Sequence, residues 1–82
     1  MLKIYYFGRL GERAARREEN LVLPEGVTSI FSLKTWLDTE YDLGGALHDI
    51  SVKTMINQSL VHGDMVLQGD EEIGFLPPVG GG

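Results

Sequence analysis

The sequence EEIGFLPPVGGG, residues 71–82, joins a strand pattern to a tail of proline and glycine. In its first half the side chains alternate, which predicts a closing strand over residues 71–76 with Ile73 and Phe75 on one face and Leu76 on the other. The two prolines that follow fix φ and hold the chain extended. The glycines after them have no side chain, so the backbone can pass through a slot too narrow for a Cβ. The strand therefore feeds directly into a stiff arm with a thin tip.

This arm, residues 77–82, is long enough to act at a distance from the domain. At about 3.3 Å per extended residue it reaches about 20 Å, enough to place a terminal carboxylate inside the active site of another protein. Glycine-rich ends also occur as flexible linkers and frayed termini, but a linker needs no rigid apolar approach such as Pro-Pro-Val. We therefore expect a domain over residues 1–76 and an extended tail over residues 77–82 that carries a reactive terminus.

Composition excludes several classes of function. The net charge of −5 over 82 residues argues against nucleic-acid and anionic-membrane binding, because phosphate contacts need clustered Lys and Arg. No apolar run reaches membrane-spanning length and the start of the chain is strand-like rather than signal-like, so a cytoplasmic protein is expected. The chain has no cysteine, and His48 and His62 stand apart without metal-ligand spacing, so we expect no thiol nucleophile, disulfide or metal site.

Alternating and helical patterns divide the domain into strands and one main helix. Strands are expected at residues 2–7, 20–23, 53–57, 60–61 and 71–76, the first two forming a hairpin. The helix is expected to begin at a cap, Thr28 or Ser29, and to present Ile30, Leu33, Leu37 and Tyr41 to the core. The order of elements is typical of an α+β layer with one helix over a mixed sheet.

The segment from Arg9 to Glu19 is rich in charge and holds four of the seven cations of the chain. It is expected to be a loop with one or two helical turns around residues 10–15. One interpretation is a solvated connector. The other is that its arginines face an acidic partner surface or an anionic substrate.

Several short stretches together carry a resemblance to a known family. They are Tyr6-Phe7 with Arg9-Leu10, Leu23-Pro24-Glu25-Gly26, Ile56-Asn57-Gln58, Leu67-x-Gly69-Asp70-Glu71 and Phe75-Leu76-Pro77-Pro78-Val79-x-Gly81-Gly82. The set resembles the small subunit of molybdopterin synthase, also called molybdopterin-converting factor subunit 1, of the MoaD/ThiS-type ubiquitin-like sulfur carriers. The resemblance implies a ubiquitin-like β-grasp fold, in which the first and last strands lie side by side at the centre of a mixed sheet covered by one main helix.

The resemblance also implies a chemistry for the tail. In this family a ubiquitin-activating-type adenylyltransferase uses ATP to adenylate the terminal glycine, here Gly82, and a sulfur-donating desulfurase system supplies the sulfur of a thiocarboxylate. The tail then enters the large subunit of molybdopterin synthase, where cyclic pyranopterin monophosphate receives the sulfur, in a heterotetramer of two large and two small subunits. The small subunit is non-catalytic alone and holds no permanent cofactor, so general acid and base groups belong to the partner.

Partner contacts implied by the family fall on the docking surface and the tail. The residues are Phe7, Leu60, Phe75, Leu76, Pro77, Pro78, Val79 and Gly80, with Gly81 preceding the reactive Gly82. Phe75 is also a core candidate, because it shares a face with Ile73, and Leu76 is favoured for docking. Gly80 departs from the family, which usually has a small non-glycine residue there, and the arginines of residues 13–17 belong to no transferable motif.

Three other functions remain open at this point. The chain could be a sulfur carrier for thiazole or another thiolated product, since those carriers also end in Gly-Gly. It could be a protein modifier whose Gly82 forms isopeptide bonds with lysines. It could also be a non-covalent β-grasp binding module in which the glycines are incidental.

Overall fold

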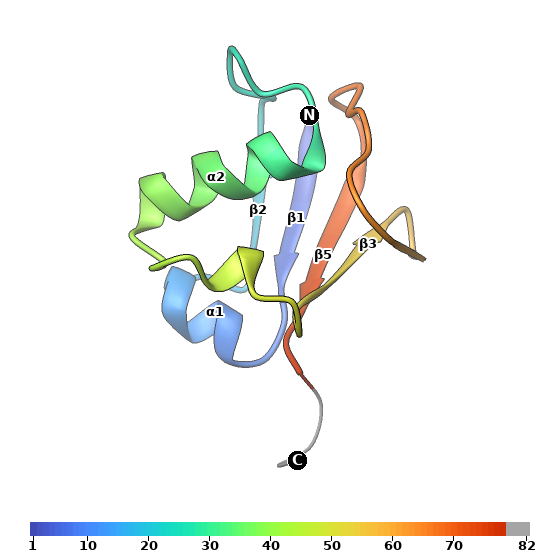
Figure 1. Ribbon diagram of the computed structural model, residues 1–82. Helices are drawn as coiled ribbons and strands as arrows, with labels where there is room; N and C mark the ends of the chain where they lie inside the picture. Colours follow the sequence, from blue (N-terminus) through green and yellow to red (C-terminus); the bar gives the residue numbers. More distant parts are fainter. Residues whose placement is uncertain (79–82) are drawn as a thin grey trace.

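Five strands form one mixed sheet in the order β2-β1-β5-β3-β4 (Figure 1). The strands are β1 Leu2–Tyr6, β2 Glu18–Leu21, β3 Lys53–Ile56, β4 Ser59–Val61 and β5 Glu72–Leu76. The computed structural model describes residues 1–78. The first and last strands, β1 and β5, pair in parallel at the centre, and every other pair is antiparallel. This confirms the expected α+β β-grasp fold.

The main helix, α2 Ile30–Tyr41, crosses one face of the sheet (Figure 1). It begins with a reciprocal cap, in which the Ser29 hydroxyl accepts from the Ser32 N–H and the Ser32 hydroxyl accepts from the Ser29 N–H. Leu33 and Leu37 are fully buried, as the helical spacing predicted. The helix ends at Asp42, whose backbone is left-handed with φ 52°.

Two shorter helices cover the rest of the same face. The first, α1 Arg9–Ala14, buries Leu10 and Ala14, and the second, the 3₁₀ helix η1 Ala46–His48, buries Leu47. The one or two helical turns expected around residues 10–15 are confirmed, as a helix of six residues. Within the described residues, no helix is long and apolar enough to cross a membrane.

The second strand begins two residues earlier than the expected 20–23. It pairs antiparallel with β1 in the register Leu2↔Leu21 and Tyr5↔Glu18, which confirms the expected hairpin, and α1 lies in the connection between the two strands. The pattern failed because Glu19 lies on the inward face, where two tyrosine hydroxyls bind its carboxylate. The sequence pattern placed Glu19 in the charged connector rather than in the strand.

At the edge of the sheet opposite β2, β3 and β4 form the expected hairpin. Asn57 and Gln58 at its turn both have positive φ, 49° and 72°, which is the pattern of a type I′ turn. Leu60 in β4 then pairs with Met55 in β3, and Met55 pairs with Gly74 in β5. These three positions therefore lie in one row across the sheet.

Candidate functional site

The site lies at the end of β5, where the chain leaves the sheet. Pro77 is half-buried and Pro78 is exposed, so the chain emerges from the centre of the sheet directly into solvent (Figure 1). The predicted tail residues Val79, Gly80, Gly81 and Gly82 lie outside the described residues, and their roles stay predictions.

Gly8 holds the base of the tail in place. Its backbone adopts φ 56° and ψ −133°, a region that is open essentially to glycine alone. A Cβ built on Gly8 would come within 2.9 Å of the Cγ of Pro77, so the proline ring occupies the space that a side chain would need. The neighbouring Phe7 N–H donates to the Phe75 carbonyl at 3.1 Å, which ties the end of β1 to the end of β5.

The sheet face opposite the helices carries an apolar surface beside this exit. Tyr5 and Phe7 stack with ring centroids 6.0 Å apart, and the Phe7 ring lies over Gly74, where a Cβ would approach its Cε2 to 3.0 Å. A small hollow of about 170 Å³ opens between these rings and Met55. The row Gly74, Met55, Leu60 extends this surface to the sheet edge. We call Tyr5, Phe7, Met55, Leu60 and Leu76 the open-face surface.

The predicted docking residues differ in how much of each side chain is exposed to solvent. Phe7 is 41% exposed and Leu60 is 57% exposed, and both belong to the same apolar surface, which is the arrangement that marks interaction sites. Leu76 is half-buried on the face that Lys53 and Gly74 share. These three residues can contact a partner, and their docking role stays a prediction.

Phe75 cannot contact a partner directly, and its prediction as a partner-binding residue is wrong. Its side chain is 0% exposed and packs at 6.0 Å from the Tyr6 ring, in the core beneath the helices. The strand alternation placed it beside Ile73, which is also fully buried. The core interpretation of that alternation is confirmed.

Two residues of the open-face surface were missed as site residues. Tyr5 alternates with Phe7 along β1, so the partly apolar outer face of that strand was a usable signal. The sequence gives no such signal for Met55, because its place beside Leu60 depends on the β3–β4 register.

A partly buried polar network lies on the helical side of the site. The Tyr6 and Tyr41 hydroxyls donate to the two carboxylate oxygens of Glu19 at 2.7 and 2.6 Å, and Arg16 donates to the Tyr41 hydroxyl at 2.8 Å. Burial raises the pKa of Tyr6 far above its usual range, and the hydrogen bond to Glu19 raises it further. The same two effects raise the pKa of Tyr41 to about 12. Both phenols therefore stay protonated near neutral pH, and the network joins β1, β2 and α2.

The described residues offer positioning groups rather than reacting groups. Among residues 1–78, no cluster of three His, Asp or Glu side chains could hold a metal ion. The buried Glu71 carboxylate accepts from the N–H groups of Gln68 and Gly69 at 2.7 and 2.9 Å, so it closes a turn. What the arrangement can do is hold a tail at a fixed exit, next to an apolar surface.

Comparison with solved structures finds close likeness of shape at low sequence identity. A Pyrococcus furiosus protein assigned to molybdopterin converting factor, subunit 1, is 26% identical over 95% of this chain and 97% of its own, with a TM-score of 0.75. Small archaeal modifier protein 1 from Methanosarcina acetivorans is 26% identical over 99% of this chain and 95% of its own, with a TM-score of 0.76.

Small archaeal modifier protein 1 from Haloferax volcanii is only 17% identical, with a TM-score of 0.79 over 99% of this chain and 98% of its own, and it supports the fold alone. Comparison with curated proteins gives no significant match. The model of the ThiS family, however, matches residues 4–82, nearly the whole sequence. The chain therefore belongs to the ThiS family of ubiquitin-like sulfur carriers and small modifiers.

Proposed function

We propose that this protein is a sulfur carrier in molybdenum cofactor biosynthesis. Its Gly82 is adenylated, converted to a thiocarboxylate, and donates sulfur to cyclic pyranopterin monophosphate within molybdopterin synthase. One observation carries the proposal: the central strand β5 runs straight into Pro77 and Pro78 beside an exposed apolar surface. The family match and the likeness to the Pyrococcus furiosus protein support the same assignment.

Adenylation is needed because a carboxylate is a poor electrophile. A carboxylate oxygen of Gly82 attacks the α-phosphorus of ATP, and pyrophosphate leaves. The terminal sulfur of a donor persulfide then attacks the acyl carbon, and AMP leaves, which gives an acyl disulfide. A second thiol attacks the donor sulfur of this disulfide, so that the thiocarboxylate leaves and the donor is left as a disulfide with that thiol. An enzyme of the ubiquitin-activating type supplies the ATP site for this step, as family membership implies.

The chain itself contributes the sulfur and its position. A tail held at its base by Gly8 and by the Phe7–Phe75 hydrogen bond leaves the domain in one direction, so less freedom is lost when it enters an active site. The open-face surface would dock against the large subunit. Burying the exposed parts of Phe7 and Leu60 there would contribute about 1 kcal/mol each.

The test is the intact mass of the protein purified from its own host under mild conditions. A mass increase equal to replacement of one oxygen by sulfur is expected, and a variant without Gly82 should lack it. Because thiocarboxylates hydrolyse, the protein is then incubated with the activating enzyme, ATP and a sulfur donor. Failure to gain sulfur even there would overturn the proposal.

Protein modification is a second candidate, favoured by the likeness to small archaeal modifier protein 1 of Methanosarcina acetivorans. The activated carboxyl of Gly82 would then form an amide with a lysine of a target protein, releasing AMP. Conjugates that resist a denaturing gel and require Gly82 would support this function. Their absence, together with thiocarboxylate formation, would favour the sulfur carrier.

A further inference from the structure

Charge is distributed unevenly along this chain. Residues 9–17 contain four arginines and one glutamate, a net charge of +3, within a protein whose net charge is −5. The remainder of the chain therefore carries −8, and an acidic partner would be repelled by most of the surface. Only the end of the molecule that holds α1 would attract it.

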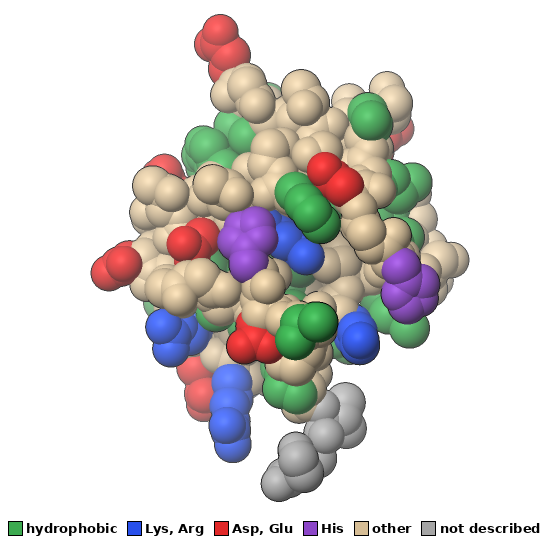
Figure 2. Space-filling view, in the orientation of Figure 1, with side chains coloured by type: hydrophobic (Ala, Val, Ile, Leu, Met, Phe, Trp, Pro, Cys, Tyr) green, Lys and Arg blue, Asp and Glu red, His purple; other side chains and the backbone are tan. Residues whose placement is uncertain are grey.

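This positive segment lies at the end of the domain from which the tail leaves. Arg9 follows Gly8, which contacts Pro77, and the Arg17 carbonyl accepts from the Tyr6 N–H at 2.8 Å at the end of β1. Figure 2 shows Lys and Arg side chains at the same end of the molecule that holds α1 in Figure 1.

Two of the four arginines are used within the fold. Arg13 donates from Nε to the Leu43 carbonyl at 3.2 Å, and Arg16 lies 3.8 Å over the Tyr41 ring while it donates to the hydroxyl. The other two, Arg9 and Arg17, are exposed, and within residues 1–78 their guanidinium groups make no hydrogen bond or ion pair. Nothing described in the fold accounts for them.

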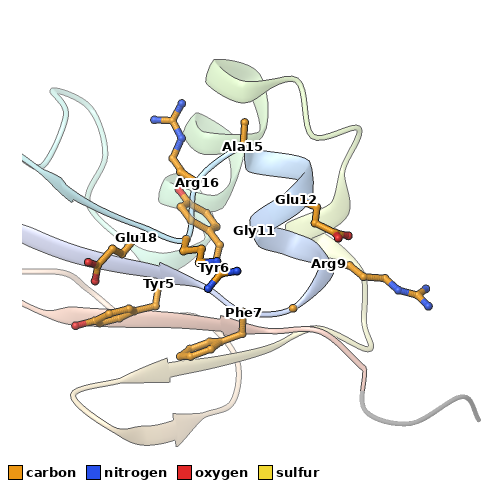
Figure 3. Close-up of a pocket in the computed structure, with 11 residues that line it drawn as sticks. Tyr5, Tyr6, Phe7, Arg9, Gly11, Glu12, Ala15, Arg16 and Glu18 are labelled. Carbon is orange, nitrogen blue, oxygen red and sulfur yellow. The ribbon is translucent and has the colours of Figure 1, made fainter.

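Both of these arginines line one groove of about 1030 Å³ with Tyr5 and Phe7. Figure 3 shows the two aromatic rings side by side, with Arg9 extending from α1 away from the sheet. Glu18, which also lines the groove, is paired with Lys3 at 3.5 Å. Glu12 and Arg16 line the groove as well, so it combines three arginines and two glutamates with aromatic rings that belong to the open-face surface.

We propose that Arg9 and Arg17 bind carboxylates on an acidic surface of the enzyme that adenylates Gly82, and so orient the domain for entry of the tail. This inference rests on the proposed function. Arginine suits the role because its planar fork binds carboxylates in a bidentate way. A protein surface fits better than a nucleic acid, because two cations are few for a phosphate backbone and the rest of the chain would repel it. Charges at the rim of such a contact mainly raise the rate of association.

The experiment compares two double variants with the same change of net charge. Arg9→Gln with Arg17→Gln removes the charges beside the tail. Lys34→Gln with Thr39→Glu, called the lysine variant, makes the same change of −2 in net charge on α2, outside the groove. Each full-length protein is titrated into the adenylating enzyme with ATP, and kcat and KM for adenylation are measured at low and high salt. Melting temperatures confirm that all variants are folded.

The arginine variant should show kcat/KM about ten-fold lower than wild type at low ionic strength, through KM, with kcat unchanged. The difference should nearly vanish at about 1 M salt, where the Debye length is about 3 Å. The lysine variant should resemble wild type. If wild type is adenylated and the two variants behave alike, the inference is wrong and the proposed function stands. If wild type is not adenylated at all, both are wrong.

Discussion

The ring of Pro77 lies against Gly8, with its Cγ only 2.9 Å from the position a Cβ on Gly8 would take. Replacing Gly8 with alanine should therefore meet two obstacles, the clash with Pro77 and a φ of 56° with ψ −133° that other residues avoid. We expect Gly8→Ala to lower the free energy of unfolding by about 1–3 kcal/mol, measured by chemical denaturation.

Gly26→Ala is the matched control for this variant. Gly26 also has a positive φ, 83°, but a Cβ there would have no heavy atom within 4 Å. Gly26→Ala should lower the free energy of unfolding by only about 1 kcal/mol, through backbone strain. Only Gly8→Ala should also slow adenylation of Gly82, because only Gly8 sets the direction of the tail. Equal rates for the two variants would contradict a positioning role for the Gly8–Pro77 contact.

Leu60→Asp should weaken binding to a large subunit of molybdopterin synthase without unfolding the domain. Leu60 is 57% exposed, so a charge there costs little in the free protein but must be desolvated when the open-face surface is covered. The dissociation constant should rise by about ten-fold or more, measured by calorimetry, since about 1 kcal/mol of apolar burial is lost and the new carboxylate must be desolvated.

Val22→Asp provides the comparison for that change. Val22 is also well exposed, but it follows β2 at the end of the sheet away from the tail, so its substitution should leave binding unchanged. If Leu60→Asp lowers the melting temperature in parallel with binding, the side chain is structural and its place in the docking surface is wrong.

Much of the fold could be predicted from periodicity, and the exceptions have physical causes. Alternation located β1 and β5, and the spacing of Leu33 and Leu37 located α2. The shifted β2 could not be predicted, because Glu19 is buried by partners that come from β1 and α2. A local pattern does not reveal partners that tertiary structure supplies.

Only part of the candidate site could be predicted, because local patterns do not show which strands become neighbours. Exposed Phe7 and Leu60 could be identified from the resemblance and from their chemistry, whereas the place of Met55 beside Leu60 required the strand register. Composition could not show which arginines make contacts within the fold and which are exposed. Arg13 and Arg16 are bound within the fold, and Arg9 and Arg17 extend from it.

A comparison of Phe75→Ala with Phe7→Ala should distinguish the stability role of a core residue from the binding role of a surface residue. Phe75 is fully buried against Tyr6, so its truncation leaves a cavity and should cost about 3–5 kcal/mol of unfolding free energy. Phe7 is 41% exposed, so its loss should cost clearly less stability but should weaken docking. Urea denaturation and calorimetric binding measure the two effects. Similar losses of stability in the two variants would contradict the assignment of Phe75 to the core and Phe7 to the surface.

Glu71 should make the stability of the domain depend on pH in the acidic range. Burial alone would raise the pKa of this carboxyl, but backbone N–H groups, those of Gln68 and Gly69 first, outweigh it and hold the pKa below the usual value. The carboxylate therefore stabilises the fold fully above its unfolded pKa, and this contribution is lost as the pH falls through the lower folded pKa.

Glu71→Gln should lower the free energy of unfolding by about 1–3 kcal/mol at neutral pH, because two N–H groups lose a charged acceptor. The gap to wild type should narrow as the pH falls through the lowered folded pKa of Glu71 and the wild-type carboxyl becomes protonated. Glu25→Gln, which makes the same charge change at an exposed turn, should stay within about 0.5 kcal/mol of wild type. Urea denaturation across the acidic range measures all three proteins. A gap between wild type and Glu71→Gln that stays constant down to the lowest pH would show that the charge of Glu71 does not support the turn.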